Sequence, residues 1–384
     1  MPRIVSLTVF QTDLPLRRPF QHAAARRSCS ESVFLRCVTD TGTVGFGESL
    51  PRSYVTGETR DHVVHILRDQ VLPRLLGHRF ETWNEVEAFL DGCDGKAPAE
   101  WVPPEVPQTA AWCAVDLALL DAFGRQFGQR VSGSEGGGAL DTLRYSGVLS
   151  AGGRLGTIAI CLLFRAVALR QVKIKVGHGA EDRTLPIARS WLGPRTKIRV
   201  DANMAWTVDE ARGAMRRMAG LGIGCVEQPV SAGDLEAMAD LVRNTGMDVM
   251  ADEGLTDGPS LKRLIEKKAC TAVNVRISKC GGLRASLHRC REAIEAGLVL
   301  QVGCQVGESS LLSAAQLALL SRVSPVTYAE GCYGRYLLAD DVAEPVLQWG
   351  YGGRPPMVPT GLGLGVTIDP RRLQRWTIRQ DRVE

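Results

Sequence analysis

The chain has 384 residues, 45% hydrophobic and 23% charged, with a net charge of +4, which is the composition of an ordinary globular protein. Its length suits one large barrel with an appended domain, or two domains. The basic residues are scattered, so we expect no nucleic-acid partner, and the longest apolar run, 158–164, is too short to cross a membrane. The N-terminus lacks a secretory pattern and the eleven cysteines form no CxxC pair, which favours free thiols, no zinc site and a cytoplasmic location.

The first part of the chain is typical of a small α+β domain, which we expect to occupy residues 1–130. Strands are predicted at 4–11, 32–38 and 44–48, helices at 58–75, 81–92 and 107–127, and loops at 17–28 and 49–59. The last helix has an apolar stripe along one face. The segment 131–141 is rich in Gly and Ser and is interpreted as a linker.

From residue 143 the pattern changes to buried strands separated by helices, and we expect a catalytic domain over 143–355. The candidate strands are 145–149, 172–176, 197–201, 225–227, 248–252, 273–277, 298–302 and 326–330. They recur about every 26 residues, which is one strand and one helix per step. Eight such strands predict a (β/α) barrel, and the absence of a GxGxxG turn argues against a dinucleotide-binding sheet.

Charged residues recur at the carboxyl ends of these strands, where barrel active sites lie. Lys173 and Lys175 alternate with apolar residues in Gln-Val-Lys-Ile-Lys-Val, so both side chains share one face of a strand. Asp201, Glu227 and Asp252 end the next three strands. A single strand-end Asp usually caps a helix or turn, but residues in register across several strands do not fit that explanation. Three converging carboxylates predict a hard divalent cation between them, with Mg²⁺ favoured.

Lys279 follows the sixth strand in Ile-Ser-Lys-Cys-Gly-Gly, and we expect it to face Lys175 across the barrel mouth. The motifs Lys-x-Lys, Asp-x-Asn-x-x-Trp, Glu-Gln-Pro, Ala-Asp-Glu and Lys-x-Gly-Gly occur in order, preceded by the helix segment 114–124. As a set they resemble the enolase superfamily, and within it the muconate lactonizing enzyme subgroup of the mandelate racemase/muconate lactonizing enzyme family. The resemblance implies an α/β fold, a modified (β/α)7β TIM-like barrel with an α+β capping domain that the C-terminal segment, 356–384, returns to complete.

The resemblance also implies catalytic residues Lys173, Lys175 and Lys279. Mg²⁺, or Mn²⁺ in its place, would be held by Asp201, Glu227 and Asp252, with Asn203 and Glu253 beside these ligands. The chemistry is removal of a proton α to a carboxylate, with the enediolate stabilised by the cation. A lysine that acts as base must be neutral, and the cation at Lys173 favours that form of Lys175.

The reaction that follows proton removal stays open. Two opposed lysines permit racemisation or epimerisation, whereas one lysine with a cationic spectator suits cycloisomerisation or syn elimination. The eighth-strand segment 329–341 resembles the corresponding region of cycloisomerases and lacks the Asp-x-Asp of dipeptide epimerases. We therefore favour a muconate cycloisomerase-like enzyme acting on a dicarboxylate.

Three alternatives are weighed against it. The first is a racemase, an epimerase or an o-succinylbenzoate synthase-like enzyme acting on an N-acylated amino acid or a related carboxylate. A catalytically silent binding protein is disfavoured because all the charged positions are intact, and a Schiff-base aldolase would not need three carboxylates. The residues considered for contact with the substrate are Glu330, Tyr54 and Arg52, together with Arg18, Arg26 and Arg27, although these arginines could equally be surface residues.

The helix expected at 155–170 has no charged residue between Arg154 and Arg165. An outer barrel helix needs an apolar stripe only where it meets the strands. We therefore predict a homo-oligomer in which Ile158, Leu162 and their neighbours are buried between subunits, the alternative being that another part of the chain covers them.

Overall fold

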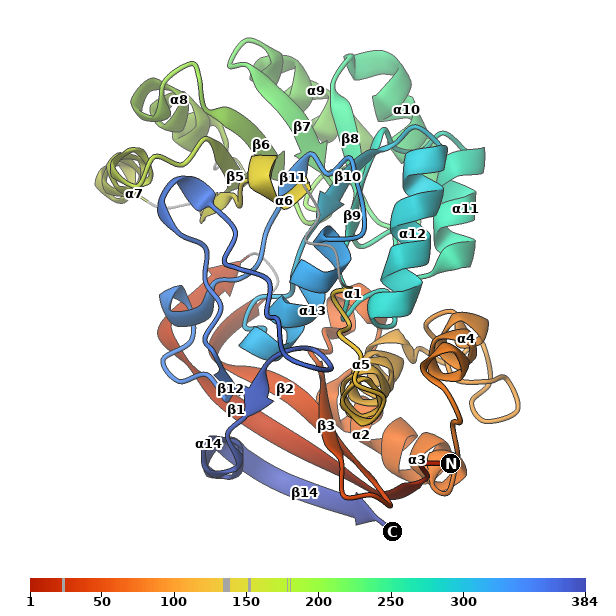
Figure 1. The fold of residues 1–384 in the computed structure, drawn as a ribbon. Helices are drawn as coiled ribbons and strands as arrows, with labels where there is room; N and C mark the ends of the chain where they lie inside the picture. The colour runs from red at the N-terminus through yellow and green to blue at the C-terminus, as the bar shows by residue number, and fades with distance from the viewer. Residues whose placement is uncertain (23–24, 134–138, 151–152, 178, 180) are drawn as a thin grey trace.

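The computed structural model describes residues 1–22, 25–133, 139–150, 153–177, 179 and 181–384. An antiparallel sheet with helices forms one end of the molecule, and eight parallel strands surrounded by helices form the other (Figure 1). Both chain termini lie at the antiparallel end. Within the described residues, no helix has the length and apolar character needed to cross a bilayer.

The antiparallel sheet has the strand order β14-β1-β2-β3. Its strands are β1 (Ile4–His22), β2 (Ala25–Thr39), β3 (Val44–Ser49) and β14 (Thr377–Val383). Helix α5 (Thr109–Gln126) crosses this sheet at close range because β3 carries glycines on the facing side. A Cβ at Gly47 would lie 2.0 Å from the carbonyl oxygen of Ala114, so the alternating glycines of Val-Gly-Phe-Gly-Glu are needed for the helix to approach.

The prediction of a loop at 17–28 is wrong. Strands β1 and β2 continue through most of this range as one long hairpin, with residue pairs from Leu14 and Ser30 out to His22 and Ala25, and residues 23 and 24 lie outside the described part. The segment contains one proline and four arginines without apolar alternation, so its strand character comes from pairing with the other arm of the hairpin. The range 49–59, also predicted as a loop, contains a short helix, α1 (Ser53–Thr56).

The barrel sheet has the order β11-β10-β9-β8-β7-β6-β5-β4, and all neighbouring pairs are parallel. Its strands are β4 (Gly147–Leu149), β5 (Gln171–Lys175), β6 (Lys197–Asp201), β7 (Ile223–Glu227), β8 (Asp248–Ala251), β9 (Ala272–Val275), β10 (Val299–Val302) and β11 (Tyr328–Ala329). A single parallel bridge between Tyr145 and Ala329 joins the first strand to the last. The fold is therefore a TIM-like barrel with an α+β cap, as predicted.

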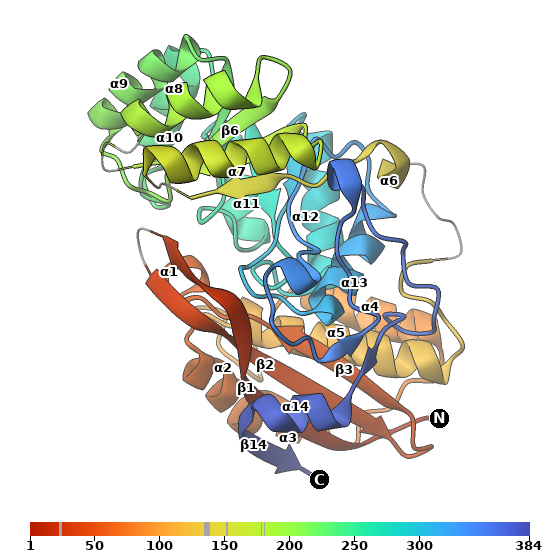
Figure 2. The ribbon, with the colours of Figure 1, turned by 90° about the vertical axis from the view of Figure 1, so that its left-hand side faces the viewer.

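The helices alternate with these strands around the barrel (Figure 2). The barrel helices are α7 (Arg154–Ala166), α8 (Glu181–Leu192), α9 (Val208–Ala219), α10 (Leu235–Thr245), α11 (Gly258–Glu266), α12 (Leu283–Glu295) and α13 (Ser310–Leu320). The remaining helices are α2 (Arg60–Ile66), which continues through a π-helical turn at Leu67–Val71 into α3 (Leu72–Leu75), then α4 (Trp83–Cys93), α6 (Ala139–Thr142) and α14 (Pro370–Trp376). A short ladder of β12 (Ala343–Glu344) with β13 (Thr367–Ile368) precedes α14.

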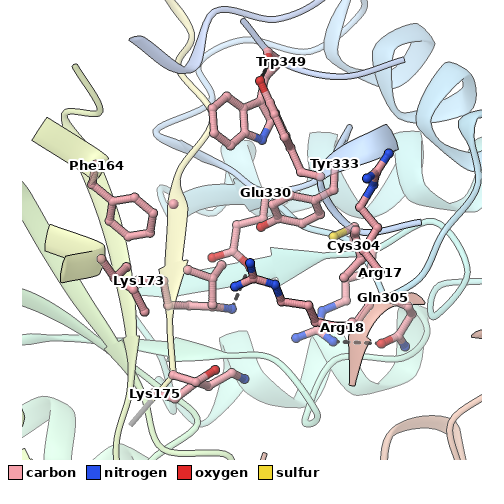
Figure 3. A pocket seen from close by; sticks show the side chains of 18 of the residues that line it. Arg17, Arg18, Phe164, Lys173, Lys175, Cys304, Gln305, Glu330, Tyr333 and Trp349 are labelled. Atoms are coloured by element: carbon pink, nitrogen blue, oxygen red, sulfur yellow. Dashed lines mark hydrogen bonds and ion pairs between the residues drawn. The ribbon is translucent and has the colours of Figure 1, made fainter. Parts of the chain in front are cut away.

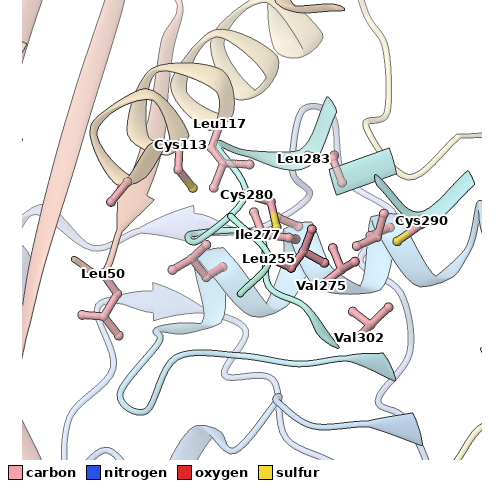
Figure 4. Packing of buried hydrophobic residues seen from close by; sticks show 14 of the residues in the cluster. Leu50, Cys113, Leu117, Leu255, Val275, Ile277, Cys280, Leu283, Cys290 and Val302 are labelled. Atoms are coloured by element: carbon pink, nitrogen blue, oxygen red, sulfur yellow. The ribbon is translucent and has the colours of Figure 1, made fainter. Parts of the chain in front are cut away.

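The cap packs on the barrel through α5, whose residues Cys113 and Leu117 lie beside Ile277, Cys280 and Leu283 in a buried cluster (Figure 4). Asp116 of the same helix accepts hydrogen bonds from the backbone N–H groups of Leu283 (2.8 Å) and Arg284 (3.4 Å) at the start of α12. A Cβ at Gly282, whose φ is +109°, would lie 2.4 Å from the Asp116 side chain. The Gly-Gly pair that follows Lys279 thus lets the cap reach the end of a barrel helix.

Helix α7 presents much of its apolar surface to the outside. Leu155 is 81% exposed and Leu162 is 45% exposed, while Ile158 is half-buried. The alternative that the chain itself covers Leu162 is therefore wrong for the described residues. The homo-oligomer stays a prediction.

Candidate active site

A cavity of about 710 Å³ opens at the carboxyl ends of the barrel strands. Its polar floor comes from the barrel, with Lys173, Lys175 and Glu330 facing inward, and Arg17 and Arg18 reach it from the cap hairpin (Figure 3). Its volume lies in the range of pockets that hold small organic ligands. The position matches the end of the barrel at which active sites form.

The two lysines of β5 meet at one carboxylate. Oδ2 of Asp201 lies 2.6 Å from Nζ of Lys175 and 3.2 Å from Nζ of Lys173, which confirms that both lysines point to the same face of the strand. Lys173 is 3% exposed and also lies 3.3 Å from Glu227 and 2.7 Å from Glu330. Burial alone would lower the pKa of Lys173, but these three carboxylates raise it well above its ordinary value, which favours the charged form of Lys173.

The three strand-end carboxylates, Asp201, Glu227 and Asp252, are fully buried. Burial, reinforced by the neighbouring Asp201 and Asp252, raises the pKa of Glu227. Burial and the same two aspartates raise the pKa of Glu253 to about 7, and Oε2 of Glu253 has no hydrogen-bond partner among the described residues. Crowded, buried carboxylates of this kind are stabilised by added positive charge.

The backbone at these strand ends is held in unusual conformations. Asn203, Met204 and Gln228 have φ values of 45°, 64° and 38°, in the left-handed region that non-glycine residues rarely occupy. Gln228 accepts hydrogen bonds from the backbone N–H groups of Asp252 (3.0 Å) and Gly254 (3.1 Å). The glutamine of the Glu-Gln-Pro motif thereby holds in place the loop that carries Asp252.

Arg276 belongs to the same cluster and was missed by the sequence reasoning. Its guanidinium donates to Asp252 and to Gln305 (3.0 Å) and lies 3.6 Å from Glu227. A signal was present, because Asn274 and Arg276 alternate with valines just as Lys173 and Lys175 do. Asn274 in turn donates to Glu227 (2.9 Å), so the polar face of this segment points into the barrel.

The donor set fits a hard divalent cation, since buried carboxylate oxygens and the unpartnered oxygen of Glu253 are the ligands that Mg²⁺ prefers. Positive side chains now lie among these oxygens, Lys173 between Asp201 and Glu227, and Arg276 between Asp252 and Glu227. Across the part of the chain that the structure describes, no three His, Cys, Asp or Glu residues form a group that could hold a metal as they stand. A bound cation would compete with these two side chains for the same atoms.

Lys279 does not line the cavity, contrary to the expectation that it faces Lys175 across the mouth. Its side chain is fully buried, and Nζ donates to the carbonyl oxygens of Asp252 (2.5 Å) and Asn274 (2.8 Å) and to Oδ1 of Asp252 (2.8 Å). These acceptors occupy the three N–H bonds of an ammonium group. Lys279 therefore supports the position of Asp252.

The other predicted residues divide between the cavity and its surroundings. Asn203 lines the cavity and joins Lys175 (2.7 Å) to Glu253 (3.0 Å), while Tyr54 and Arg18 line it from the cap. Arg52 does not line it, because its buried guanidinium donates to the carbonyl oxygens of Pro51 and Val306.

The remaining predicted residues have partners or lie outside the described part. Glu330 is paired with Lys173 and Arg199. Arg27 is paired with Glu31, away from the cavity lining, and the side chain of Arg26 lies outside the described part. Only some of the cap arginines are therefore available to a substrate.

Comparison with known proteins gives consistent matches over the whole chain. Residues 4–133 match the family described as mandelate racemase / muconate lactonizing enzyme, N-terminal domain, and residues 162–372 match enolase C-terminal domain-like. The chain is 27% identical to an N-succinyl-L-Arg/Lys racemase of Bacillus cereus over 99% of both chains. It is 26% identical to a chloromuconate cycloisomerase of Cupriavidus pinatubonensis over 95% of this chain and 96% of that one. The crystal structure of a muconate lactonizing enzyme from Pseudomonas fluorescens, complexed with muconolactone, superposes with a TM-score of 0.84, at 26% identity over 98% and 99% of the two chains.

Proposed function

Since the chain belongs to the mandelate racemase and muconate lactonizing enzyme family of the enolase superfamily, we propose that it is an isomerase that uses Mg²⁺ to remove a proton α to a substrate carboxylate. In this proposal residues 1–130 and 356–384 form the cap, and residues 143–355 form the catalytic barrel. Support for a catalytic role comes from Lys175, which lines the cavity beside the buried carboxylates.

Asp201, Glu227 and Asp252 would hold the cation, with Asn203 and Glu253 supporting them. A bound Mg²⁺ supplies positive charge next to the substrate carboxylate, where negative charge develops when the α-proton leaves. Lys173, held between three carboxylates, provides a second fixed positive charge at the cavity floor. Lys175 is the group that moves the proton, because it lines the cavity and, among the described residues, its Nζ pairs with a single carboxylate, Asp201.

The observation that carries the choice of reaction is the difference between the two lysines. Lys175 lines the cavity, whereas Nζ of Lys279 is buried and donates hydrogen bonds to three acceptor atoms on Asp252 and Asn274. One lysine that transfers protons and one that is held away from the cavity suit a one-base reaction. We therefore favour a cycloisomerase-like, lactonizing reaction on a carboxylate substrate.

Proton exchange in D₂O tests this assignment. With Mg²⁺ present, a carboxylate library followed by ¹H NMR should show α-proton exchange, and replacing Lys175 by Arg should abolish it for every substrate. Exchange at both enantiomers of a chiral substrate, with each lysine controlling one of them, would contradict the one-base assignment. Full exchange in EDTA would contradict the role of Mg²⁺.

A racemase or epimerase acting on an N-acylated amino acid is the second candidate. The end-to-end match to the N-succinyl-L-Arg/Lys racemase favours it, and so does a cavity of about 710 Å³, which is large for a short dicarboxylate. In this case Lys279 would have to leave its acceptors on Asp252 and Asn274. The exchange experiment with both enantiomers distinguishes the two candidates.

A further inference from the structure

The cavity extends beyond its polar floor to an apolar wall. On one side this wall is formed by Ile160, Leu163 and Phe164, which are spaced i, i+3 and i+4 and so share one face of α7, and by Val167, which directly follows the helix. The face is only partly covered by the chain, because Leu163 is 57% exposed and Ile160 is 37% exposed. An outer barrel helix therefore turns apolar side chains toward the same space that holds Lys175.

The chain is shaped locally to bring this face to the cavity. Strand β4 has glycine at position 147, where a Cβ would lie 2.9 Å from the ring of Phe164 and 2.7 Å from Leu169. Without a side chain there, Phe164 can lie against the strand and face the cavity (Figure 3). A side chain at position 147 would require Leu169 and Phe164 to move.

The opposite side of the wall comes from the segment after the last barrel strand. The rings of Tyr336 and Trp349 lie with their centroids 4.6 Å apart, and the hydroxyl of Tyr336 donates to the carbonyl oxygen of Trp349 (3.1 Å). Both residues line the cavity, so an apolar channel between them and α7 is continuous with the site of proton transfer. A short, fully charged substrate would leave this channel unused.

We propose that the channel between α7 and the Tyr336–Trp349 pair is a substrate subsite that binds an apolar substituent of the carboxylate substrate. The inference rests on the proposed function, which places the substrate carboxylate at the cavity floor. It makes the preferred substrate a carboxylate with a sizeable aliphatic or aromatic group distal to the reacting carbon. Each methylene that enters the channel should tighten binding about fourfold, the ratio that corresponds to burial of one CH₂ group.

Calorimetric binding of straight-chain saturated carboxylates, butanoate to decanoate, tests the subsite on the full chain with Mg²⁺. In the wild type, the dissociation constant should fall about fourfold per added methylene over part of the series. In Leu163→Asn this gain should drop below about twofold per methylene, because the wall becomes polar. Leu155→Asn is the matched control, since Leu155 lies on the same helix, is 81% exposed and does not line the cavity, and it should keep the wild-type gain.

Three results would overturn the subsite: affinity independent of chain length, no binding at any length, or the same loss in Leu155→Asn as in Leu163→Asn. A second copy of the chain covering Leu163 would give the first of these, and sedimentation would reveal it. Proton exchange of the carboxylate library in D₂O tests the proposed function separately. Exchange within the library without a chain-length gain refutes the subsite alone, and a chain-length gain without exchange of any library member refutes the proposed function alone.

Discussion

Lys173 compensates buried negative charge, and replacing it with Met should strongly destabilise the metal-free protein. Its Nζ lies within 3.3 Å of Asp201, Glu227 and Glu330, and none of these groups is more than 4% exposed. Removing one partner from a buried ion cluster costs about 3–5 kcal/mol, because the remaining charge is left uncompensated. We expect a loss of that size at pH 8 in urea unfolding followed by circular dichroism.

The loss should shrink at lower pH. Without the ammonium, the carboxylates of the folded variant bind protons more readily than those of the unfolded chain, so the free energy of unfolding falls as pH rises from 5 to 8. In the wild type the raised pKa of Lys173 keeps its contribution fully present throughout this range, which lies below the pKa of a lysine in the unfolded chain. The difference between the two proteins should therefore grow from pH 5 to pH 8.

A matched control is Lys262→Met, since Lys262 is 78% exposed and lies 3.9 Å from Glu266. It should change the free energy of unfolding by no more than about 0.5 kcal/mol. Equal losses in the two variants, or a loss in Lys173→Met that does not vary with pH, would refute the assignment of Lys173 as the compensating charge. Calorimetry provides a second test. A cation that competes with Lys173 should bind the variant more tightly than the wild type, and weaker binding would contradict that competition.

Four further predictions follow from the site and its supports. Asp252→Ala should abolish α-proton exchange and weaken Mg²⁺ binding measured by calorimetry, and activity retained in EDTA would contradict this. Lys175→Arg should stop all exchange, whereas Lys279→Arg should lower kcat without selecting one enantiomer; loss of exchange at one enantiomer in each variant would point to a racemase. Asp116→Ala should lower the free energy of unfolding by about 1–2 kcal/mol through loss of the α12 cap, and Asp116→Asn, which keeps an acceptor, should lower it less. Leu162→Glu should shift sedimentation toward smaller species if α7 lies between subunits, and an unchanged oligomer would exclude Leu162 from the contact.

The barrel and its charged strand ends could be predicted because they depend on short-range patterns. A strand alternates its faces every two residues, so the sequence around Lys173 and Lys175 was enough to place both ammonium groups on one face, and the structure shows that they meet at Asp201. The spacing of about 26 residues then placed Asp201, Glu227 and Asp252 on neighbouring strands, and the parallel ladders β5–β6–β7–β8 agree with that spacing.

Features that depend on a distant partner could not be predicted. The hairpin at 17–28 is extended because its two arms pair with each other, although neither arm has the apolar alternation of a strand. The direction of Lys279 depends on carbonyl groups supplied by Asp252 and Asn274, 27 and 5 residues away in the chain. The sequence motifs therefore show which lysines are present, but only the folded structure shows which of them can reach a substrate.

Helix α7 shows the same limit for apolar residues. Its lack of charge predicted a partner for a fully apolar surface, but the face with Leu163 and Phe164 lines the cavity, and Leu155 and Leu162 point elsewhere and are exposed. An apolar side chain on an outer helix can pack in the core, bind a ligand or contact another subunit. Its hydrophobicity alone does not distinguish these three cases. The position of Gly147 supports an inward position of one face, because a Cβ there would lie 2.9 Å from the ring of Phe164. For the remaining exposed leucines, Leu155 and Leu162, burial against a second subunit stays a prediction.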